Sequence, residues 1–218
     1  MRTVAVVALK GGSGKTTVAT HLALAAHLRG APVLVADIDP QHSAHDLLDA
    51  RSEPGPACVT TTGPKLLAAQ LAAGGLQKDL LVIDTAAGAV EDLGEAIVLA
   101  DLVVMVVRPT LLDIAGLART LSIVRRLGKP STVVVNQAPT AREGAEAPVV
   151  RRALRALEYM QAPLAPAILR SRTIYQVALE RGRSVEETSD KSAAREVAAL
   201  WDFVEAQLAQ GRAAAAPA

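Results

Sequence analysis

The stretch that decides the fold is Lys10-Gly11-Gly12-Ser13-Gly14-Lys15-Thr16-Thr17, which follows the apolar run Val4–Leu9. An apolar run, a glycine-rich turn and an alanine-rich segment, in this order, predict a buried strand, a tight loop and a helix. Three glycines within four positions allow backbone angles that a Cβ would hinder, so main-chain N–H groups can converge on an anion. The stretch therefore predicts a phosphate-binding loop at a helix N-terminus, whose partial positive charge also favours an anion.

The two lysines of this stretch stand in different relations to the expected phosphates. Lys15 has the position from which a lysine reaches the β- and γ-phosphates, and Thr16 follows it with a hydroxyl that can bind Mg²⁺. The usual spacing places a glycine five residues before Gly14, but Leu9 stands there and Lys10 adjoins the first glycine instead. The alternative interpretation is a glycine-rich turn that carries two exposed lysines.

The pattern K-G-G-x-G-K-T-T resembles the deviant Walker A box of the ParA/MinD family of P-loop ATPases. This resemblance implies that the chain hydrolyses ATP with Mg²⁺. It also implies that Lys10 reaches across an ATP-bound sandwich dimer to the partner's phosphates, where its charge stabilises the transferred phosphoryl group. The nucleotide contacts that it implies for the loop are Lys10, Gly11, Gly12, Ser13, Gly14, Lys15, Thr16 and Thr17.

A pair of carboxylates follows the second apolar run, Pro32–Ile38. In a strand, Asp37 and Asp39 point to the same side because side chains alternate with a period of two. Two carboxylates repel a triphosphate unless Mg²⁺ lies between them or one of them polarises water. The segment Asp37–Gln41 resembles the D-x-D-P-Q box of ParA proteins, which implies that Asp39 positions the attacking water and that Asp37 supports the hydration shell of Mg²⁺. The alternative is an Asp-Pro turn that caps the following helix.

A third acid closes the apolar run Asp79–Asp84, as in a Walker B strand, whose carboxylate holds Mg²⁺. Many strands end in an aspartate, so the run alone is a weak signal. Its place after the D-x-D-P-Q box resembles the D-T-P-P segment of the family, which implies that Asp84 joins Thr16 and Asp37 at the metal. The segment Ala86-Ala87-Gly88 stands where the family has prolines, so the conformation of this loop is not predicted.

Two further strand ends resemble nucleotide-site positions of ParA proteins. The segment Val107–Thr110 resembles their V-x-P-[ST] turn, which implies that Pro109 lines the active-site edge of the dimer. Asn136, at the end of the apolar run Thr132–Asn136, matches the position whose side-chain amide contacts adenine. An amide both donates and accepts hydrogen bonds, which suits an adenine edge. A lone asparagine at a strand end is otherwise a turn former.

Apolar runs alternate with alanine- and leucine-rich segments, which predicts an α/β fold with a doubly wound, mostly parallel sheet flanked by helices. The 218 residues suffice for one domain, expected over residues 1–210, with a disordered tail over 211–218. Half of the residues are hydrophobic and 2% are aromatic, so Ala, Val and Leu must supply the core. Further strands are expected near Val59–Thr62 and over Asp101–Val107 and Leu164–Leu169. Helices are expected over Thr16–Arg29, Lys65–Ala73, Leu111–Leu127, Val149–Tyr159 and Asp190–Gln210.

Positive charge is concentrated in one part of the chain. Residues 114–183 hold twelve Arg or Lys against four Glu, a local net charge of +8, although the whole chain carries only +1. Such a split predicts a basic surface. In ParA proteins, basic residues of the C-terminal third bind DNA without sequence preference, and such phosphate contacts weaken steeply with salt. The resemblance implies this role for Arg152, Arg170, Arg172 and Arg183; the alternative is an ordinary solvated arginine face.

The motifs together imply an ATPase that dimerises on ATP and binds DNA non-specifically. A ParB-like or other adaptor protein would stimulate hydrolysis and release it, which would segregate or position a plasmid, a chromosome or a protein cluster. A MinD-like membrane-cycling ATPase needs a C-terminal amphipathic helix with bulky apolar residues, whereas Gln207–Ala218 has one Arg, one Leu and no aromatic residue. A metabolic ligase built on the same loop needs a second substrate site, which the motifs do not identify, so both alternatives stay open.

The compartment is predicted from cysteine content and hydropathy. Cys58 is the only cysteine, so no intramolecular disulfide can form and a reducing compartment is expected. The first apolar run is too short for a signal peptide, and no stretch approaches the roughly 20 apolar residues that cross a bilayer. We therefore expect a cytoplasmic protein that does not bind membranes and that associates with the nucleoid when ATP is bound.

Overall fold

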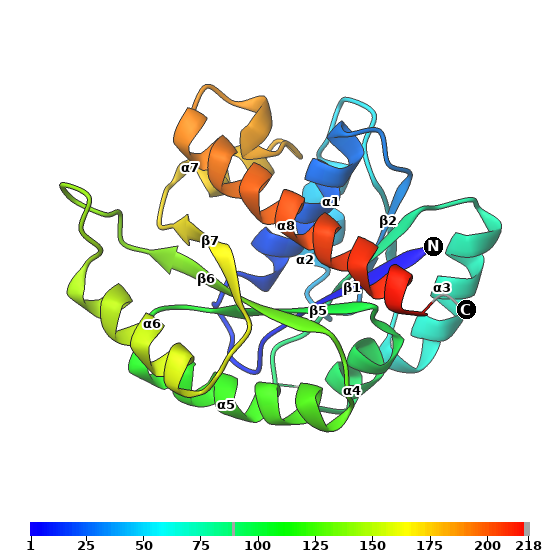
Figure 1. Cartoon of the computed structure of the whole chain (residues 1–218). Helices are drawn as coiled ribbons and strands as arrows, with labels where there is room; N and C mark the ends of the chain where they lie inside the picture. Colours follow the sequence, from blue (N-terminus) through cyan, green and yellow to red (C-terminus); the bar gives the residue numbers. More distant parts are fainter. Residues whose placement is uncertain (89, 216–218) are drawn as a thin grey trace.

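The structure, a computed structural model, describes residues 1–88 and 90–215. Its centre is a seven-stranded sheet in the order β3-β2-β4-β1-β5-β6-β7, in which every neighbouring pair is parallel (Figure 1). The strands are β1 (Arg2–Val7), β2 (Val33–Asp37), β3 (Ala57–Thr60), β4 (Leu80–Asp84), β5 (Leu102–Val107), β6 (Ser131–Ala138) and β7 (Leu164–Arg170).

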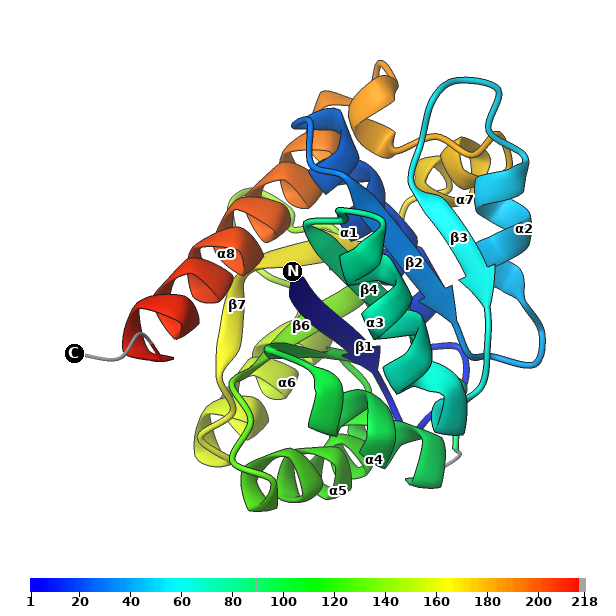
Figure 2. The same cartoon turned by 90° about the vertical axis from the view of Figure 1, so that its right-hand side faces the viewer.

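Helices cover both faces of this sheet (Figures 1 and 2). Since successive strand residues point to opposite faces, β1 places Val4 and Val6 in one core and Ala5 and Val7 in the other. The first core is covered by α1 (Lys15–Leu28), α2 (Ser43–Asp49), α7 (Ile174–Leu179) and α8 (Lys191–Ala215). The second is covered by α3 (Leu66–Gly75), α4 (Val90–Leu99), α5 (Leu111–Arg126) and α6 (Pro148–Tyr159). Single 3₁₀ turns lie at Gly63–Lys65 and Val185–Glu187.

The chain changes its direction across the sheet at β1. It proceeds from β1 to β2 and β3, returns to β4 beside β1, and continues on the other side with β5, β6 and β7. In open parallel sheets, ligands bind outside the carboxyl ends of the strands at such a reversal. The turn Lys10–Thr17 leaves β1 at this place, so the topology puts the predicted phosphate-binding loop at the expected ligand edge.

The α/β class, the parallel sheet and the flanking helices confirm the predicted fold. The structure adds three helices that were not predicted, α2, α4 and α7, and β3 begins two residues before the expected Val59. The final helix α8 runs to Ala215, so the expected tail starts as helix, while residues 216–218 lie outside the described residues. Within residues 1–88 and 90–215, no helix has both the length and the apolar character needed to cross a membrane.

Candidate nucleotide site

The glycine-rich turn owes its shape to two glycines. Gly12 and Gly14 have positive φ angles of 73° and 88°, in the left-handed region that favours glycine. A Cβ at Gly14 would also collide with the side-chain amide of Asn136. The turn leads directly into Lys15, the first residue of α1. The buried Ser13 hydroxyl has no hydrogen-bond partner among the described residues, and since buried polar groups are normally paired, it is a candidate ligand contact.

Lys15 lies in an enclosed position beside acids. Only 6% of this residue is exposed. Burial lowers the pKa of its ammonium group, and the carboxylates of Asp84 and Asp39 act in the opposite direction. One cation and two acids therefore share a small volume at the carboxyl ends of β1, β2 and β4.

Two buried acids stand side by side on adjacent strands. Asp37 and Asp84 are register partners on β2 and β4. Asp37 is paired, because its oxygens accept hydrogen bonds from the backbone N–H groups of Asp39 and His45, each at 3.0 Å. Neither oxygen of Asp84 has a hydrogen-bond partner within the described part of the chain. Burial raises the pKa of Asp84 to about 7, and the nearby Thr16 hydroxyl opposes that rise.

This set of donors fits Mg²⁺ bound together with a nucleotide. A divalent cation would supply the partner that the Asp84 carboxylate lacks, with Thr16 and Asp37 close to it. Among the described residues, no group of three or more His, Cys, Asp or Glu side chains could hold a metal. Phosphate oxygens and waters would therefore complete the shell, as Mg²⁺ usually prefers. Such an ion, held near Thr16, Asp37 and Asp84, would supply positive charge beside the phosphates.

Asp39 lies at the entrance to this site. Its Oδ1 accepts a hydrogen bond from the backbone N–H of Gln41 at 3.0 Å, so the local Asp-Pro turn exists. No hydrogen bond to its Oδ2 is formed by the described residues, which leaves that oxygen available to a water molecule. The turn and the water-positioning role are therefore compatible, and the role stays a prediction.

Lys10 lies on α5 rather than over its own turn. A Cβ at Gly116 of α5 would lie 3.5 Å from Lys10 Cγ, and Lys10 Nζ lies 3.9 Å from Asp113 Oδ1. The Lys10 side chain is 42% exposed. The guanidinium of Arg108 binds the same carboxylate, with its Nε 2.6 Å from Asp113 Oδ2. The two lysines of the turn thus differ, because Lys15 is enclosed whereas Lys10 is partly exposed and lies against α5.

The turn between β5 and α5 brings an unpredicted residue to the site. Thr110 caps α5, since its hydroxyl accepts a hydrogen bond from the backbone N–H of Asp113 at 3.2 Å. Pro109 lines a groove between α5 and α6. Arg108 is the residue that approaches the glycine-rich turn, with its Nη1 3.6 Å from the place where a Cβ of Gly12 would be. The sequence signal that could have identified Arg108 was its charge within the V-x-P-[ST] turn.

Small residues replace the prolines of the family after β4. The Cβ of Ala87 lies 3.8 Å from the place of a Cβ at Gly11, so this loop lies against the glycine-rich turn. Gly88 has a positive φ of 84°, which glycine readily adopts.

Asn136 also contacts the glycine-rich turn. Its buried side-chain amide donates a hydrogen bond to the carbonyl of Ser13 at 2.8 Å. The next residue, Gln137, donates from its side chain to the carbonyl of Gly12 at 3.1 Å. The adenine contact expected for Asn136 stays a prediction, and the contact to the turn is an addition from the structure. Nothing in the sequence around Gln137 indicated its role.

Two of the arginines expected to contact DNA form ion pairs within the chain. Both nitrogens at the tip of Arg170 bind Glu146, at 2.7 and 2.6 Å. Arg172 binds Glu196 at 2.8 Å, and the same carboxylate accepts a hydrogen bond from the Tyr175 hydroxyl. These pairs connect separate elements, which is a structural role.

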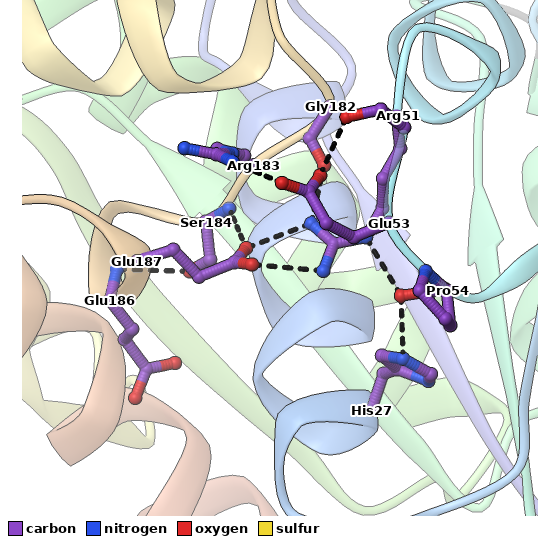
Figure 3. Close-up of polar contacts among 10 residues, drawn as sticks. His27, Arg51, Glu53, Pro54, Gly182, Arg183, Ser184, Glu186 and Glu187 are labelled. Atoms are coloured by element: carbon purple, nitrogen blue, oxygen red, sulfur yellow. Dashed lines mark hydrogen bonds and ion pairs between the residues drawn. The ribbon is translucent and has the colours of Figure 1, made fainter.

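Arg183 is paired as well, next to a buried network (Figure 3). It binds Glu53, on the turn that follows α2. In the same network, Arg51 donates to both carboxylate oxygens of Glu187 at 2.9 Å and to the carbonyl of Gly182 at 2.9 Å. The network therefore fixes the turn after α2 to the turn after α7.

Arg152 differs from the other three predicted arginines. It is exposed on α6, as is Arg155 one turn later, and neither forms an ion pair within residues 1–88 and 90–215. Tyr159, at the end of the same helix, is 91% exposed. Arg152 also lines the groove that contains Pro109 and Leu111. Of the four arginines predicted to contact DNA, Arg152 is therefore the one that is exposed without an ion pair among the described residues.

Two solved structures share this fold closely. McdA from Cyanothece superposes with a TM-score of 0.77 and 21% identity, over 95% of this chain and 99% of that one. MinD from Pyrococcus horikoshii OT3, complexed with Mg-ADP, superposes with a TM-score of 0.74 and 19% identity, over 96% and 98%. At such identities, the likeness shows the fold.

A curated relative matches over a short segment. A putative replication protein A from Rhizobium rhizogenes is 45% identical over 53 residues, which are 24% of this chain and 13% of that protein. The match therefore spans about an eighth of the length of that relative.

The family match covers most of the chain. Residues 4–185 match the family described as the CobQ/CobB/MinD/ParA nucleotide binding domain. The matched residues include the glycine-rich turn, the three acids and Asn136. The chain therefore belongs to the CobQ/CobB/MinD/ParA family of nucleotide-binding domains, which confirms the ParA/MinD resemblance predicted from its sequence.

Proposed function

We propose that this chain, whose family binds ATP with Mg²⁺, is a ParA-type positioning ATPase. Two copies close around ATP and Mg²⁺, bind DNA without sequence preference, and separate after an adaptor protein stimulates hydrolysis. The cycle moves or places a cargo such as a plasmid, a chromosome or a protein cluster. Lys15 holds the phosphate end of the nucleotide and Asp39 orients the attacking water, while Thr16, Asp37 and Asp84 would hold Mg²⁺, which would supply positive charge at the phosphates.

The position of Lys10 is the observation that supports this proposal most directly. Its stem packs on Gly116 of α5, its ammonium group lies 3.9 Å from Asp113 Oδ1, and its side chain is 42% exposed. The first turn of α5 beside it exposes two large apolar side chains, Leu111 (84% exposed) and Leu112 (68%). A partly exposed cation next to an apolar surface suits a contact with a second copy.

Removal of the Lys10 ammonium group tests the dimer. In the presence of ATP and Mg²⁺, light scattering after gel filtration should give a dimer for the Asp39→Ala protein, in which slow hydrolysis preserves the complex. The Lys10→Ala, Asp39→Ala protein should remain largely monomeric, because the transferred phosphates lose a positive partner. Lys78→Ala removes a lysine that precedes β4, at the opposite edge of the sheet, and serves as the matched control. An ATP-dependent dimer of unchanged stability in the Lys10 variant would refute the trans role.

For DNA, we propose that the exposed arginines of α6 make the main phosphate contacts. Arg152 and Arg155 lie about one turn apart on this helix and are both exposed. Arg170, Arg172 and Arg183 rank below them because their guanidinium groups already hold carboxylates. A bound carboxylate must be displaced before such a group can contact phosphate.

Two double variants test this assignment. The affinity of the ATP-bound protein for random-sequence DNA is measured by fluorescence anisotropy over a range of salt concentrations. Arg152→Ala with Arg155→Ala should weaken binding and lower the slope of log K against log salt by about 2, one for each phosphate contact. Arg170→Ala with Arg172→Ala should leave that slope unchanged. A lower slope in the Arg170, Arg172 variant and an unchanged slope in the Arg152, Arg155 variant would assign the DNA contact to Arg170 and Arg172 instead.

A further inference from the structure

We propose that Asn136 and Gln137, at the end of β6, form a clamp that holds the phosphate-binding turn in its anion-binding shape. Asn136 Nδ2 lies 2.8 Å from the Ser13 carbonyl oxygen, and Gln137 Nε2 lies 3.1 Å from the Gly12 carbonyl oxygen. Both residues are thus positioning residues. The inference rests on nucleotide binding by the family and is independent of the proposed dimer and DNA contact.

The backbone at the end of β6 departs from regular strand geometry, which lets two successive side chains reach the same turn. Successive strand residues normally point to opposite faces and cannot reach one target together. Here the pairing of β6 with β7 shifts register between Val135 and Ala138, and Gln137 has a left-handed φ of 53°. Glutamine is uncommon in that region, which costs free energy unless other contacts maintain it. The bond from Gln137 to the turn is such a contact.

The geometry of the peptide bond connects the clamp to phosphate binding. In a planar trans peptide, the carbonyl of one residue and the N–H of the next point in opposite directions. A hydrogen bond to the Gly12 carbonyl therefore turns the N–H of Ser13 away from β6, and a bond to the Ser13 carbonyl does the same for Gly14. These N–H groups belong to the turn on which an anion is expected to bind. The clamp orients the donors without touching the ligand.

Three ligands distinguish a clamp from a contact with adenine. Dissociation constants of ATP, GTP and inorganic tripolyphosphate, each with Mg²⁺, are measured by calorimetry for the wild type, Asn136→Ala and Gln137→Ala. The clamp predicts that each variant binds all three ligands about 3- to 10-fold more weakly, the usual effect of one lost hydrogen bond. A loss confined to ATP would identify an adenine contact and overturn the proposal, as would unchanged affinity for all three.

A matched control and a second measurement complete the test. Gln77 is also an exposed glutamine with a φ of 53°, but it follows α3, so Gln77→Ala should leave all three affinities unchanged. In the ligand-free proteins, amide hydrogen exchange at Ser13 and Gly14 should be faster in both clamp variants and unchanged in the control. Because Gln137 is exposed, Gln137→Ala should fold, and it can still be measured if Asn136→Ala does not fold. Exchange at wild-type rates would overturn the clamp even if the wild type failed to bind nucleotide.

Discussion

The nucleotide edge and the region beside α7 and β7 differ in whether their buried polar groups have hydrogen-bond partners. At the nucleotide edge, the Ser13 hydroxyl and both oxygens of Asp84 have no partner among the described residues. Beside α7 and β7, in contrast, Arg51 and Arg170 each hold a carboxylate with two nitrogens. A fold leaves a buried polar group unpaired only at a cost in stability. At the nucleotide edge, the unpaired Ser13 and Asp84 are thus candidate ligand contacts, whereas the paired Arg51 and Arg170 hold separate elements of the chain together.

This difference changes how the basic third of the chain is interpreted. Net charge predicts a basic surface, but it does not show which charges are available to a partner. Three of the four arginines expected at DNA are paired with Glu146, Glu196 or Glu53. Among these four arginines, availability rather than the sign of the charge distinguishes Arg152 on α6.

The largest effect on stability is expected where the ion pair of Arg51 with Glu187 is broken. The Arg51 side chain is only 5% exposed, so Arg51→Met leaves Glu187 charged in a largely buried place. We expect a loss of about 4 kcal/mol in the free energy of unfolding, measured with urea. Arg51→Met with Glu187→Met should recover most of this loss, because no lone charge remains. Arg29, which pairs with Glu186 near the surface, provides the control: Arg29→Met should cost less than about 1 kcal/mol.

A loss as small as that of the Arg29 control would show that the Arg51 network is energetically ordinary. An equally large loss in the double variant would assign the effect to packing rather than to charge.

His21 lies between the two regions and gives a pH-dependent effect. Its Nδ1 donates to the Thr17 carbonyl at 2.8 Å, while Nε2 is buried without a partner among the described residues. Burial lowers the pKa of His21 to about 4 from its ordinary 6.5. Between these values the unfolded chain binds a proton that the folded chain does not, so stability falls as pH drops. The expected loss from pH 7 to pH 4 is about 3 kcal/mol.

The difference between wild type and His21→Gln, followed by urea unfolding at several pH values, isolates this effect. Asp84 acts oppositely over much of the same range, because its raised pKa makes stability fall as pH rises toward 7. The wild-type profile alone therefore hides both groups. Equal pH dependence in the two proteins would mean that His21 carries its proton in the folded state.

A smaller, stabilising effect is expected at the nucleotide edge, from a change at Asp84. Asp84→Asn removes a buried charge that has no hydrogen-bond partner among the described residues, so the nucleotide-free protein at pH 8 should gain about 2 kcal/mol in stability. The same change should abolish the stabilisation that Mg²⁺ with ATP gives to the wild type. Asp79→Asn, an exposed position just before β4, should change neither quantity. Destabilisation by Asp84→Asn would show that this carboxylate has a structural role.

The fold and the nucleotide site were predictable because their signals are local in sequence. The glycine-rich turn and the acids that end β2 and β4 are recognised from neighbouring residues, and apolar runs reveal the longer strands. The short helices α2 and α7, with seven and six residues, offer too few turns for a periodic pattern. The helix α4 contains Gly94, a weak helix former.

The contacts that were not predicted depend on positions far apart in the chain. Asn136 donates a hydrogen bond to Ser13, which lies 123 positions away in the sequence. The acceptor is a main-chain carbonyl, and the residue type at position 13 gives no sign of this contact. The pair of Arg170 with Glu146 depends on a loop whose path the sequence does not specify. Such contacts follow from the tertiary arrangement, so composition and spacing leave them open.

The close approach of Gly182 to Arg51 has a consequence for recombination between homologues. A Cβ at Gly182 would lie 2.5 Å from the Arg51 backbone nitrogen, and the φ of 62° already excludes most side chains. Backbone meets backbone here, so no rotamer change can make room. In a library of chimaeras with a crossover between positions 51 and 182, offspring should survive only when both parental segments preserve this fit. Functional clones should therefore co-inherit two stretches that lie 131 positions apart.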